Sequence, residues 1–328
     1  MNRIALFIPY FGQWPAWAEL YFASCTQQQG VDFHYFTDLQ PIAPPPQLSL
    51  HQSSNLHFHP ISFADYCRLV SDRLGIDFQP ERPYKLCDLR PFYAIVHSDL
   101  LREGNYDFWG FADLDLVWGD LKAFYTDDLL HRYDIFSTHD DRFSGHLCLL
   151  RNKPSLNTAA LRLPHWKERL CSQQNYALDE MAFTLLFYPQ ARLLWKVHRH
   201  LYLRYASHFR NEFRSYGKFC QWINALCGLR RRGIYLKEMY TSPYVTPNFV
   251  PAGGASYRYA DGHITDLATG EALPYLHFVF LKTIWTPQQA TPPAHTTDLL
   301  ISPDGILPWQ SSKEVKFPTS PTNIPTRR

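Results

Sequence analysis

The sequence predicts an α/β fold, in which a mixed sheet is flanked by helices on both faces. Residues 4–8 form an unbroken apolar run that Pro9 ends, and such a run is typical of a strand buried on both faces. Residues 15–28 have helical character, and residues 31–38 follow as a second strand. Because strands alternate with helices at these intervals, we expect helices to cover both faces of the sheet.

Further strands and helices are predicted later in the chain. The strongest predicted strand is residues 106–117, and an apolar strand over residues 276–281 comes last. An Asp-Gly pair within residues 256–266 predicts a hairpin with a tight turn. The other predicted elements are strands at residues 56–59 and 134–138 and helices at residues 63–74 and 85–101.

Composition limits the kinds of protein that this chain can be. Hydrophobic residues make up 45% of the 328, which is enough for a large core and excludes a wholly disordered chain. The formal net charge is +2, so we expect no nucleic-acid partner. The 7 cysteines form no Cys-x-x-Cys pair, which argues against a zinc ribbon and is typical of reduced cytoplasmic proteins. No apolar stretch is long enough to predict a membrane-spanning helix.

Two acidic residues interrupt the strongest predicted strand. Asp113 and Asp115 lie within the apolar segment of residues 108–119, and residues two apart on a strand point to the same side. Two neighbouring buried carboxylates need compensation, and a divalent metal ion supplies it because hard cations prefer carboxylate oxygens. The spacing alone is common by chance, so a strand end with two solvated aspartates is the alternative.

Three segments of the chain together resemble the GT-A glycosyltransferases, and more closely a bacterial family found with capsule and surface-polysaccharide synthesis. The order and spacing of these segments agree over roughly residues 1–285. The resemblance implies a GT-A (Rossmann-like) fold, in which the Asp-x-Asp motif holds a metal ion and a nucleotide-sugar diphosphate. The segments are residues 83–93 running into 106–121, residues 144–146 followed by 149–152, and residues 275–278 followed by Lys282.

The resemblance also implies how a donor is bound. Lys85 and Arg90 would offer positive charge and hydrogen-bond donors to a diphosphate, while Asp88 would pair with Lys85 or orient Arg90. The alternative for this helix face is a solvated ion-pair surface. Gly145 and His146 would form a loop close to the donor sugar, or a plain turn. The residues expected to bind the nucleotide sugar at its base, ribose and diphosphate are Pro9, Tyr10, Phe11, Asp38 and Asp113.

A further metal ligand and two catalytic acids follow from the same resemblance. His277 would return to the metal from a late strand, with a hydrogen-bonded core histidine as the alternative. Imidazole beside two carboxylates favours Mn²⁺ or Mg²⁺ over Ca²⁺. Asp179 and Glu180 begin a predicted helix, and one of them would deprotonate the acceptor hydroxyl or hold the sugar. An acidic first turn that suits the helix dipole is the alternative.

A basic and aromatic window covers residues 192–237. It contains eleven Lys or Arg and one acid, Glu212. This charge fits an anionic lipid-linked acceptor or an anionic membrane surface, or it merely faces water. We divide the chain into a nucleotide-sugar-binding core (1–191), an acceptor- or membrane-facing segment (192–245), a C-terminal hairpin and strand that return to the metal (246–285), and a partly disordered Pro/Thr/Ser-rich tail (286–328).

The leading prediction is a metal-dependent glycosyltransferase, with hexosyl transfer favoured. It would move sugar from a nucleotide sugar, preferably a UDP-sugar, to a saccharide or lipid-linked saccharide, and retention or inversion is left open. We expect a cytoplasmic protein with peripheral contact to the inner membrane face. One alternative is a haloacid-dehalogenase-like phosphatase or phosphotransferase with Asp113 as nucleophile and Asp115 as acid/base. Another is a non-catalytic carbohydrate-binding protein.

Overall fold

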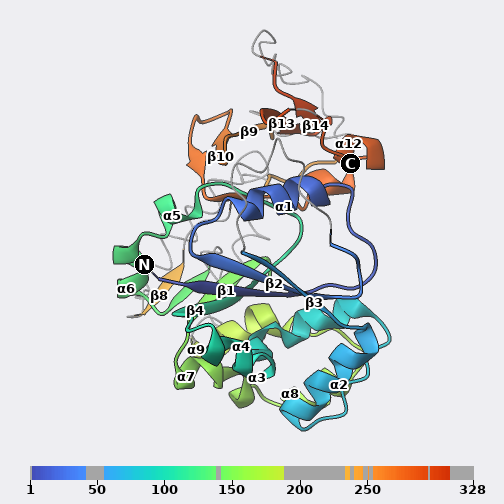
Figure 1. The fold of residues 1–328 in the computed structure, drawn as a ribbon, viewed down its shortest axis with the longest axis vertical. Coiled ribbons are helices and arrows are strands. Elements are labelled where there is room, and N and C mark those ends of the chain that lie inside the picture. Colours follow the sequence, from blue (N-terminus) through green and yellow to red (C-terminus); the bar gives the residue numbers. More distant parts are fainter. Residues whose placement is uncertain are drawn as a thin grey trace, which may run out of the picture.

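A mixed sheet of seven strands forms the centre of the described structure (Figure 1). Its order is β3-β2-β1-β4-β7-β6-β8, with β1 parallel to β2 and β4, and β7 antiparallel to β4 and β6. The strands are β1 (Ile4–Pro9), β2 (Val31–Thr37), β3 (Leu56–Pro60), β4 (Phe108–Ala112), β6 (Ile135–Ser137), β7 (Leu147–Arg151) and β8 (Ile234–Leu236). The computed structural model describes residues 2–41, 55–137, 142–187, 233–236, 240–246, 250, 254–294 and 296–310.

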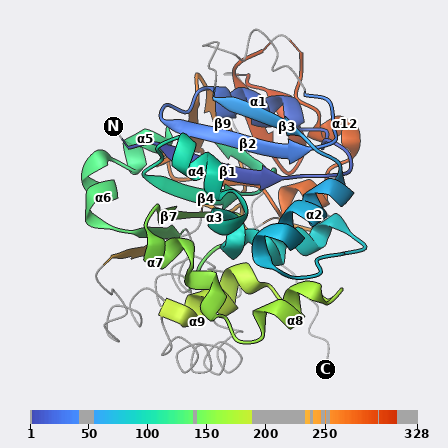
Figure 2. The same ribbon diagram turned by 60° about the horizontal axis from the view of Figure 1, so that its bottom comes forward.

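Helices cover both faces of this sheet, as predicted. The helix α1 (Ala18–Thr26) lies on one face, and α2 (Phe63–Leu74), α3 (Tyr93–Val96) and α8 (Trp166–Cys171) lie on the other, which comes forward in Figure 2. The remaining helical elements are η1 (Pro83–Phe92), α4 (Ser98–Glu103), α5 (Leu121–Phe124), α6 (Asp127–Arg132), α7 (Pro154–Asn157), η2 (Ala159–Arg162), η3 (Leu178–Ala182), α9 (Phe183–Phe187), η4 (Leu281–Thr283) and α12 (Pro287–Ala290).

The side chains of β4 show how the sheet separates two apolar layers. Trp109 and Phe111 belong to the apolar cluster between the sheet and helices α2 and α3. Phe108 belongs to the cluster on the α1 side, together with Phe33 and Phe22. Successive residues of a strand point to opposite faces, so a continuous apolar run is required where both faces are covered. The prediction of a buried α/β sheet is therefore confirmed.

A second sheet covers the outer side of α1. Its order is β11-β10-β9-β13-β14, formed by β9 (Tyr257–Ala260), β10 (His263–Asp266), β11 (Ala272–Leu273), β13 (Leu299–Ser302) and β14 (Gly305–Pro308). The predicted hairpin is present as β9 and β10, and Asp261 and Gly262 in its turn have φ of 49° and 76°. Positive φ at both central residues is the requirement of a tight primed turn.

The segment after residue 285 contains a helix and two strands that the sequence analysis did not foresee. Helix α12 and strands β13 and β14 lie within it, and β13 pairs with β9 across the register Ile301↔Tyr257. The hairpin strand β9 pairs with β10 on one edge and with β13 on the other. Short strands joined by Pro and Thr residues carry little periodic signal, which is why the sequence did not reveal them. Residues 311–328 lie outside the described part of the chain.

The predicted strand 106–117 is two strands that belong to different sheets. After β4 the chain turns at residues 113–115, and β5 (Leu116–Trp118) then pairs antiparallel with β12 (Tyr275–His277) in a separate two-stranded ribbon. The acidic pair therefore lies in the turn and not within a strand, so the expectation of two side chains on one strand face was wrong. The expected strand 276–281 is correspondingly short, because β12 ends at His277 and η4 follows.

Residues 85–101 were expected to form one helix, but the chain forms the 3-10 helix η1 with Pro91 inside it, followed by the short helices α3 and α4. Proline lacks the amide hydrogen that an α-helix needs at this point.

Of the basic window at residues 192–237, only residues 233–236 are among those described, so its role stays a prediction. None of the described helices is both long and apolar enough to cross a bilayer.

Candidate active site

The acidic turn after β4 lies at the point where the central sheet meets the β5–β12 ribbon. The backbone N–H of Asp113 donates to the carbonyl of His146 at 3.0 Å, and the N–H of Phe278 donates to the carbonyl of Asp115 at 3.1 Å. These two bonds tie the turn to β7 on one side and to the end of β12 on the other. Asp115 is buried, whereas the side chain of Asp113 is 29% exposed.

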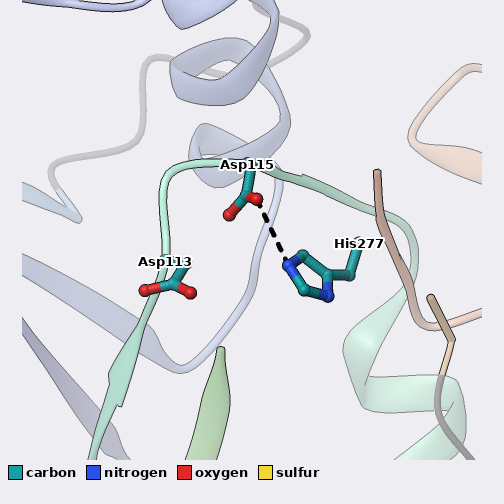
Figure 3. A group of neighbouring side chains, drawn as sticks. All are labelled: Asp113, Asp115 and His277. Atoms are coloured by element: carbon teal, nitrogen blue, oxygen red, sulfur yellow. Dashed lines mark ion pairs between the residues drawn. The ribbon is translucent and has the colours of Figure 1, made fainter. Parts of the chain in front are cut away.

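His277 reaches this turn because β12 pairs with β5. The register places His277 opposite Leu116, next to Asp115, and its Nε2 lies 3.2 Å from Asp115 Oδ2 (Figure 3). Its other ring nitrogen, Nδ1, is 3.0 Å from Thr241 Oγ1, and the ring stacks on His146 at 4.0 Å. The ring is therefore held from two sides, with Nε2 turned to the carboxylate.

Asp113, Asp115 and His277 form a group that could hold a metal ion. One ligand atom from each of the three lies within 4.8 Å of the others. Two carboxylates and an imidazole are ligands that suit Mn²⁺ or Mg²⁺. A metal-bound histidine is usually oriented by a hydrogen bond to its second ring nitrogen, and Thr241 makes this contact with His277 Nδ1. The residues present fit a divalent cation, and the prediction that these three come together is confirmed.

Lys282 is a part of the site that the prediction did not include among the site residues. Its Nζ donates to Asp115 Oδ2 at 2.6 Å, and its side chain is 32% exposed. Burial opposes ionisation of Asp115, but the hydrogen bond from His277 and the charge of Lys282 outweigh it, so the pKa of Asp115 lies below its usual range. The sequence pointed to Lys282, because this residue closely follows His277 in the third segment of the resemblance.

Arg90 connects the acidic turn to a second acidic residue. It donates to Asp113 Oδ1 through one terminal nitrogen, and through the other to Asp179 Oδ2 at 2.7 Å and to the carbonyl of Gly145 at 2.8 Å. Arg90 was predicted to contact a diphosphate. In the structure, its guanidinium joins Asp113 and Asp179, and its side chain is 14% exposed.

Asp179 and Glu180 share a helical turn but occupy different environments. Burial raises the pKa of Asp179 to about 6, although the charge of Arg90 opposes this rise. Glu180 is more exposed, at 37% of its side chain, and its Oε2 lies 3.4 Å from Arg142 Nε. The predicted α-helix begins here as the π-helical turn η3 and continues as α9. Both acids lie in the first turn of η3, as in the helix-dipole alternative, and Asp179 is in addition buried against Arg90.

Gly145 and His146 were predicted to leave room for a donor sugar, and the structure assigns them other partners. A Cβ on Gly145 would lie 3.0 Å from both Arg90 Nη1 and Asp179 Oδ2, so the missing side chain makes room for this ion pair. His146 is buried, stacks on His277, and its Nε2 lies 3.1 Å from the Tyr275 hydroxyl. The position of this loop beside a donor sugar stays a prediction.

Lys85 and Asp88 do not face a diphosphate, which corrects another prediction. They form a buried ion pair of 2.9 Å, with side chains 3% and 0% exposed. Lys85 Nζ also donates to the carbonyls of Arg169 and Gln174. The alternative that Asp88 pairs with Lys85 is confirmed, whereas the solvated surface is excluded by their burial.

The residues expected at the nucleotide base lie at the ends of β1 and β2. Phe11 is buried against Phe63 and Tyr66, so it belongs to the core and cannot border a base. Pro9 ends β1, and Tyr10 is partly buried and stacks on Trp14 at 5.3 Å. Asp38 is exposed directly after β2. The contact of Pro9, Tyr10 and Asp38 with a nucleotide stays a prediction.

Three solved structures show a partial likeness to this chain. They are a galactosyltransferase, LgtC, in complex with donor and acceptor sugar analogues (15% identity, 56% of this chain and 69% of that chain, TM-score 0.30); an active-site mutant of LgtC (13%, 56% and 68%, 0.29); and mouse xyloside xylosyltransferase 1 in its apo form (10%, 58% and 83%, 0.30). Because the identities and TM-scores are this low, the likeness says nothing about the activity of this chain.

The family comparison concerns a larger part of the chain. No curated protein matches the sequence. A family model does match, and it covers residues 6–216, which include the acidic turn, Arg90 and Asp179. The chain therefore belongs to the family of unknown function DUF6625.

Proposed function

We propose that this chain is a metal-dependent glycosyltransferase of the GT-A kind that takes sugar from a nucleotide-sugar donor. The observation that carries the proposal is the convergence of Asp113, Asp115 and His277, whose ligand atoms lie within 4.8 Å of one another after β4. Sequence positions more than 160 residues apart meet here, since Lys282 and Asp115 are separated by 167 residues. Such convergence of ionisable groups is typical of a functional site.

The charges around the turn suit a diphosphate leaving group. A divalent cation held by Asp113, Asp115 and His277 would neutralise negative charge that develops on that group. Arg90 and Lys282 each contact one of the two carboxylates, so their positive charges lie at the same place. Both side chains are partly exposed, and both can offer hydrogen bonds to phosphate oxygens once a ligand is present.

Asp179 and Glu180 serve the sugar side of the reaction in this proposal. The acceptor oxygen forms a bond to the anomeric carbon while the bond from that carbon to the diphosphate breaks, and the acceptor proton passes to a base. Glu180 is the more exposed acid and is suited to meet an acceptor hydroxyl. Asp179 is buried against Arg90 and is suited to hold a sugar hydroxyl.

The finer parts of the proposal concern donor, acceptor and place in the cell. We propose a hexosyl group carried by UDP, and a saccharide or lipid-linked saccharide acceptor in surface-polysaccharide synthesis. A cytoplasmic location with peripheral contact through residues 192–237 would bring the site to a lipid-linked acceptor. The strongly basic composition of that window supports this choice.

The phosphatase alternative is less well supported by the site. In that mechanism Asp115 must carry a proton in order to donate it to the leaving group. His277 and Lys282 instead lower the pKa of Asp115 below its usual range, against the effect of burial, which keeps the carboxylate ionised at neutral pH. An ionised Asp115 is suited to bind a cation and unsuited to act as a general acid.

The proposal is tested with purified protein and a panel of UDP-, GDP-, CMP- and dTDP-sugars with and without Mn²⁺. We expect one nucleotide to raise the melting temperature only with the metal, and nucleoside diphosphate to be released with that donor. Asp115→Asn should lower turnover by about 100-fold or more. The matched control is Asp298→Asn, which removes a carboxylate that pairs with Arg258 in the second sheet.

Other outcomes would decide against the proposal. Full turnover by Asp115→Asn would contradict the metal role. Phosphate release from a simple phosphomonoester, without nucleotide dependence, would support the phosphatase. Saccharide binding without turnover of any donor would indicate a carbohydrate-binding protein.

A further inference from the structure

The backbone before Asp179 adopts conformations that its residues do not favour by themselves. Ala177 has φ of 48° and ψ of 50°, in the left-handed region where a Cβ is unfavourable. The next five residues, Leu178–Ala182, form a π-helical turn, which is uncommon and is frequent at functional sites. Local sequence preference therefore does not explain this path, and contacts from elsewhere must hold it.

Those contacts come from Asp88. Its carboxylate accepts hydrogen bonds from the backbone N–H of Tyr176 at 2.9 Å and of Leu178 at 2.9 Å, on either side of Ala177. Both amides are directed at one carboxylate because Ala177 reverses the chain between them. Asp88 is fully buried, so no water competes for these bonds.

Lys85 completes this arrangement. Its Nζ lies 2.9 Å from Asp88 Oδ2 and donates to the carbonyl of Arg169 at 2.6 Å and to that of Gln174. The buried carboxylate is therefore paired, and the ammonium holds the chain that leads into the Ala177 turn. A buried ion pair contributes little net stability compared with apolar residues, and its best-supported use is to specify one conformation.

The same short helix also holds the side chain of Asp179. Lys85, Asp88 and Arg90 all belong to η1, and Arg90 donates to Asp179 Oδ2 at 2.7 Å. Asp88 thus holds the backbone next to Asp179 while Arg90, two residues later, holds its carboxylate. The position of Asp179 relative to Asp113 is set from a single element.

We infer that Asp88, together with Lys85, is a positioning residue that places Asp179 against Arg90 in the candidate active site. The inference rests on the proposed function, because it assigns Asp88 a part in the same reaction. Asp88 acts through Asp179 and does not touch the donor or the metal. Its loss should therefore impair turnover while it leaves metal and nucleotide binding in place.

A double-mutant cycle tests this inference. Asp88→Asn should lower kcat by about tenfold or more, because a small displacement of a group that holds the sugar is costly, while affinity for Mn²⁺ and nucleoside diphosphate stays within about twofold. If Asp88 acts through Asp179, the variant with both Asp88→Asn and Asp179→Asn should be no slower than Asp179→Asn alone. Losses that multiply would overturn the inference.

Two further variants separate positioning from a general loss of structure. Asp88→Glu keeps the charge paired with Lys85 but moves the carboxylate, and it should show the same selective loss of kcat. Ala177→Gly accepts the left-handed conformation without a Cβ, so adding it to Asp88→Asn should restore part of the lost kcat. The inference would be overturned if Ala177→Gly restored none of the kcat lost in Asp88→Asn and Asp88→Glu were as active as wild type.

Hydrogen exchange gives a readout that does not depend on the reaction. Asp88→Asn should speed exchange at the amides of Tyr176 and Leu178 and leave residues 108–112 unchanged, whereas the control Asp298→Asn should alter neither. Unchanged exchange at Tyr176 and Leu178 would overturn the inference. If no nucleotide sugar is turned over by the wild type, the proposed function fails, and exchange still decides whether Asp88 holds this turn.

Discussion

Lys282 donates from Nζ to Oδ2 of Asp115 at 2.6 Å, although 167 residues separate the two along the chain. The contact exists because β12 pairs with β5 and the chain then returns through η4 over the acidic turn. Asp115 Oδ2 also lies 3.2 Å from His277 Nε2. Oδ2 of Asp115 thus contacts both His277, a candidate metal ligand, and the positively charged ammonium group of Lys282.

This relationship predicts that Lys282 and a metal ion compete for Asp115. Lys282→Met removes a nearby positive charge, so we expect the affinity for Mn²⁺ without nucleotide to rise by about threefold to tenfold. Turnover should fall, because the same charge would stabilise a diphosphate leaving group. Isothermal titration calorimetry with Mn²⁺ measures the first effect, and Lys167→Met, on the distant helix α8, is the control. Unchanged affinity would mean that Lys282 does not compete.

The space at Gly145 predicts the effect of one added methyl group. In Gly145→Ala the new Cβ would lie 3.0 Å from Arg90 Nη1 and from Asp179 Oδ2, so these two groups must shift away from it by a few tenths of an ångström. We expect kcat/KM to fall by about tenfold or more, with a smaller effect on Mn²⁺ affinity, because none of the three atoms nearest to the new Cβ belongs to Asp113, Asp115 or His277. Steady-state kinetics and metal titration check this, and an active variant with normal kcat/KM would contradict it.

The environment of Asp179 predicts opposite effects of pH on activity and stability. Burial raises its pKa to about 6 against the charge of Arg90, so kcat/KM should fall as the pH drops through about 6 if the ionised form is needed. The pKa of this carboxyl group is near 3.8 in the unfolded state, so the folded state takes up the proton more readily. This group should therefore add stability as the pH falls from 7 to 5.

Asp179→Asn removes both effects and provides the check. The variant should melt a few degrees higher than wild type at pH 7, and this difference should shrink at pH 5. The low-pH loss of kcat/KM centred near 6 should be absent from its residual activity. A difference in melting temperature that does not change with pH would contradict the assignment.

A cluster of histidines on strands β2 and β3 predicts acid sensitivity of the fold. His34 Nδ1 lies 3.0 Å from His59 Nε2, and burial, with the charges of His57 and His59, lowers the pKa of His34 to about 3. Below its ordinary value of 6.5 the unfolded state takes up a proton that the folded state refuses, so stability falls as the pH drops from 6.5 toward 3.

We expect His34 to contribute a loss of about 1.4 kcal/mol per pH unit in that range. Urea denaturation at pH 7 and pH 5.5 measures it, and His34→Gln, which keeps hydrogen-bonding groups but does not titrate, should show a smaller loss. His263→Gln changes an exposed histidine in β10 and should behave as wild type. Equal pH dependence in His34→Gln would show that the cluster does not cause the acid sensitivity.

The sequence alone predicted the strands β1, β2, β3, β4 and β6 of the central sheet, but it did not reveal β7 or β8. Strands buried on both faces must be apolar throughout, so β1 and β4 were visible as continuous runs, and the positive φ required at Asp261 and Gly262 made their hairpin visible too. Two carboxylates in an apolar segment demand compensation wherever they lie, so Asp113 and Asp115 could be identified without coordinates.

The tertiary structure decided which charges meet. Lys85 and Arg90 are both cations on η1, yet one is buried against Asp88 and the other faces Asp113 and Asp179. Lys282 and His277 reach Asp115 only through the pairing of β12 with β5. Periodicity reports which face of an element is apolar, whereas a contact between charges depends on long-range pairing and on the path of each turn, which no local pattern encodes.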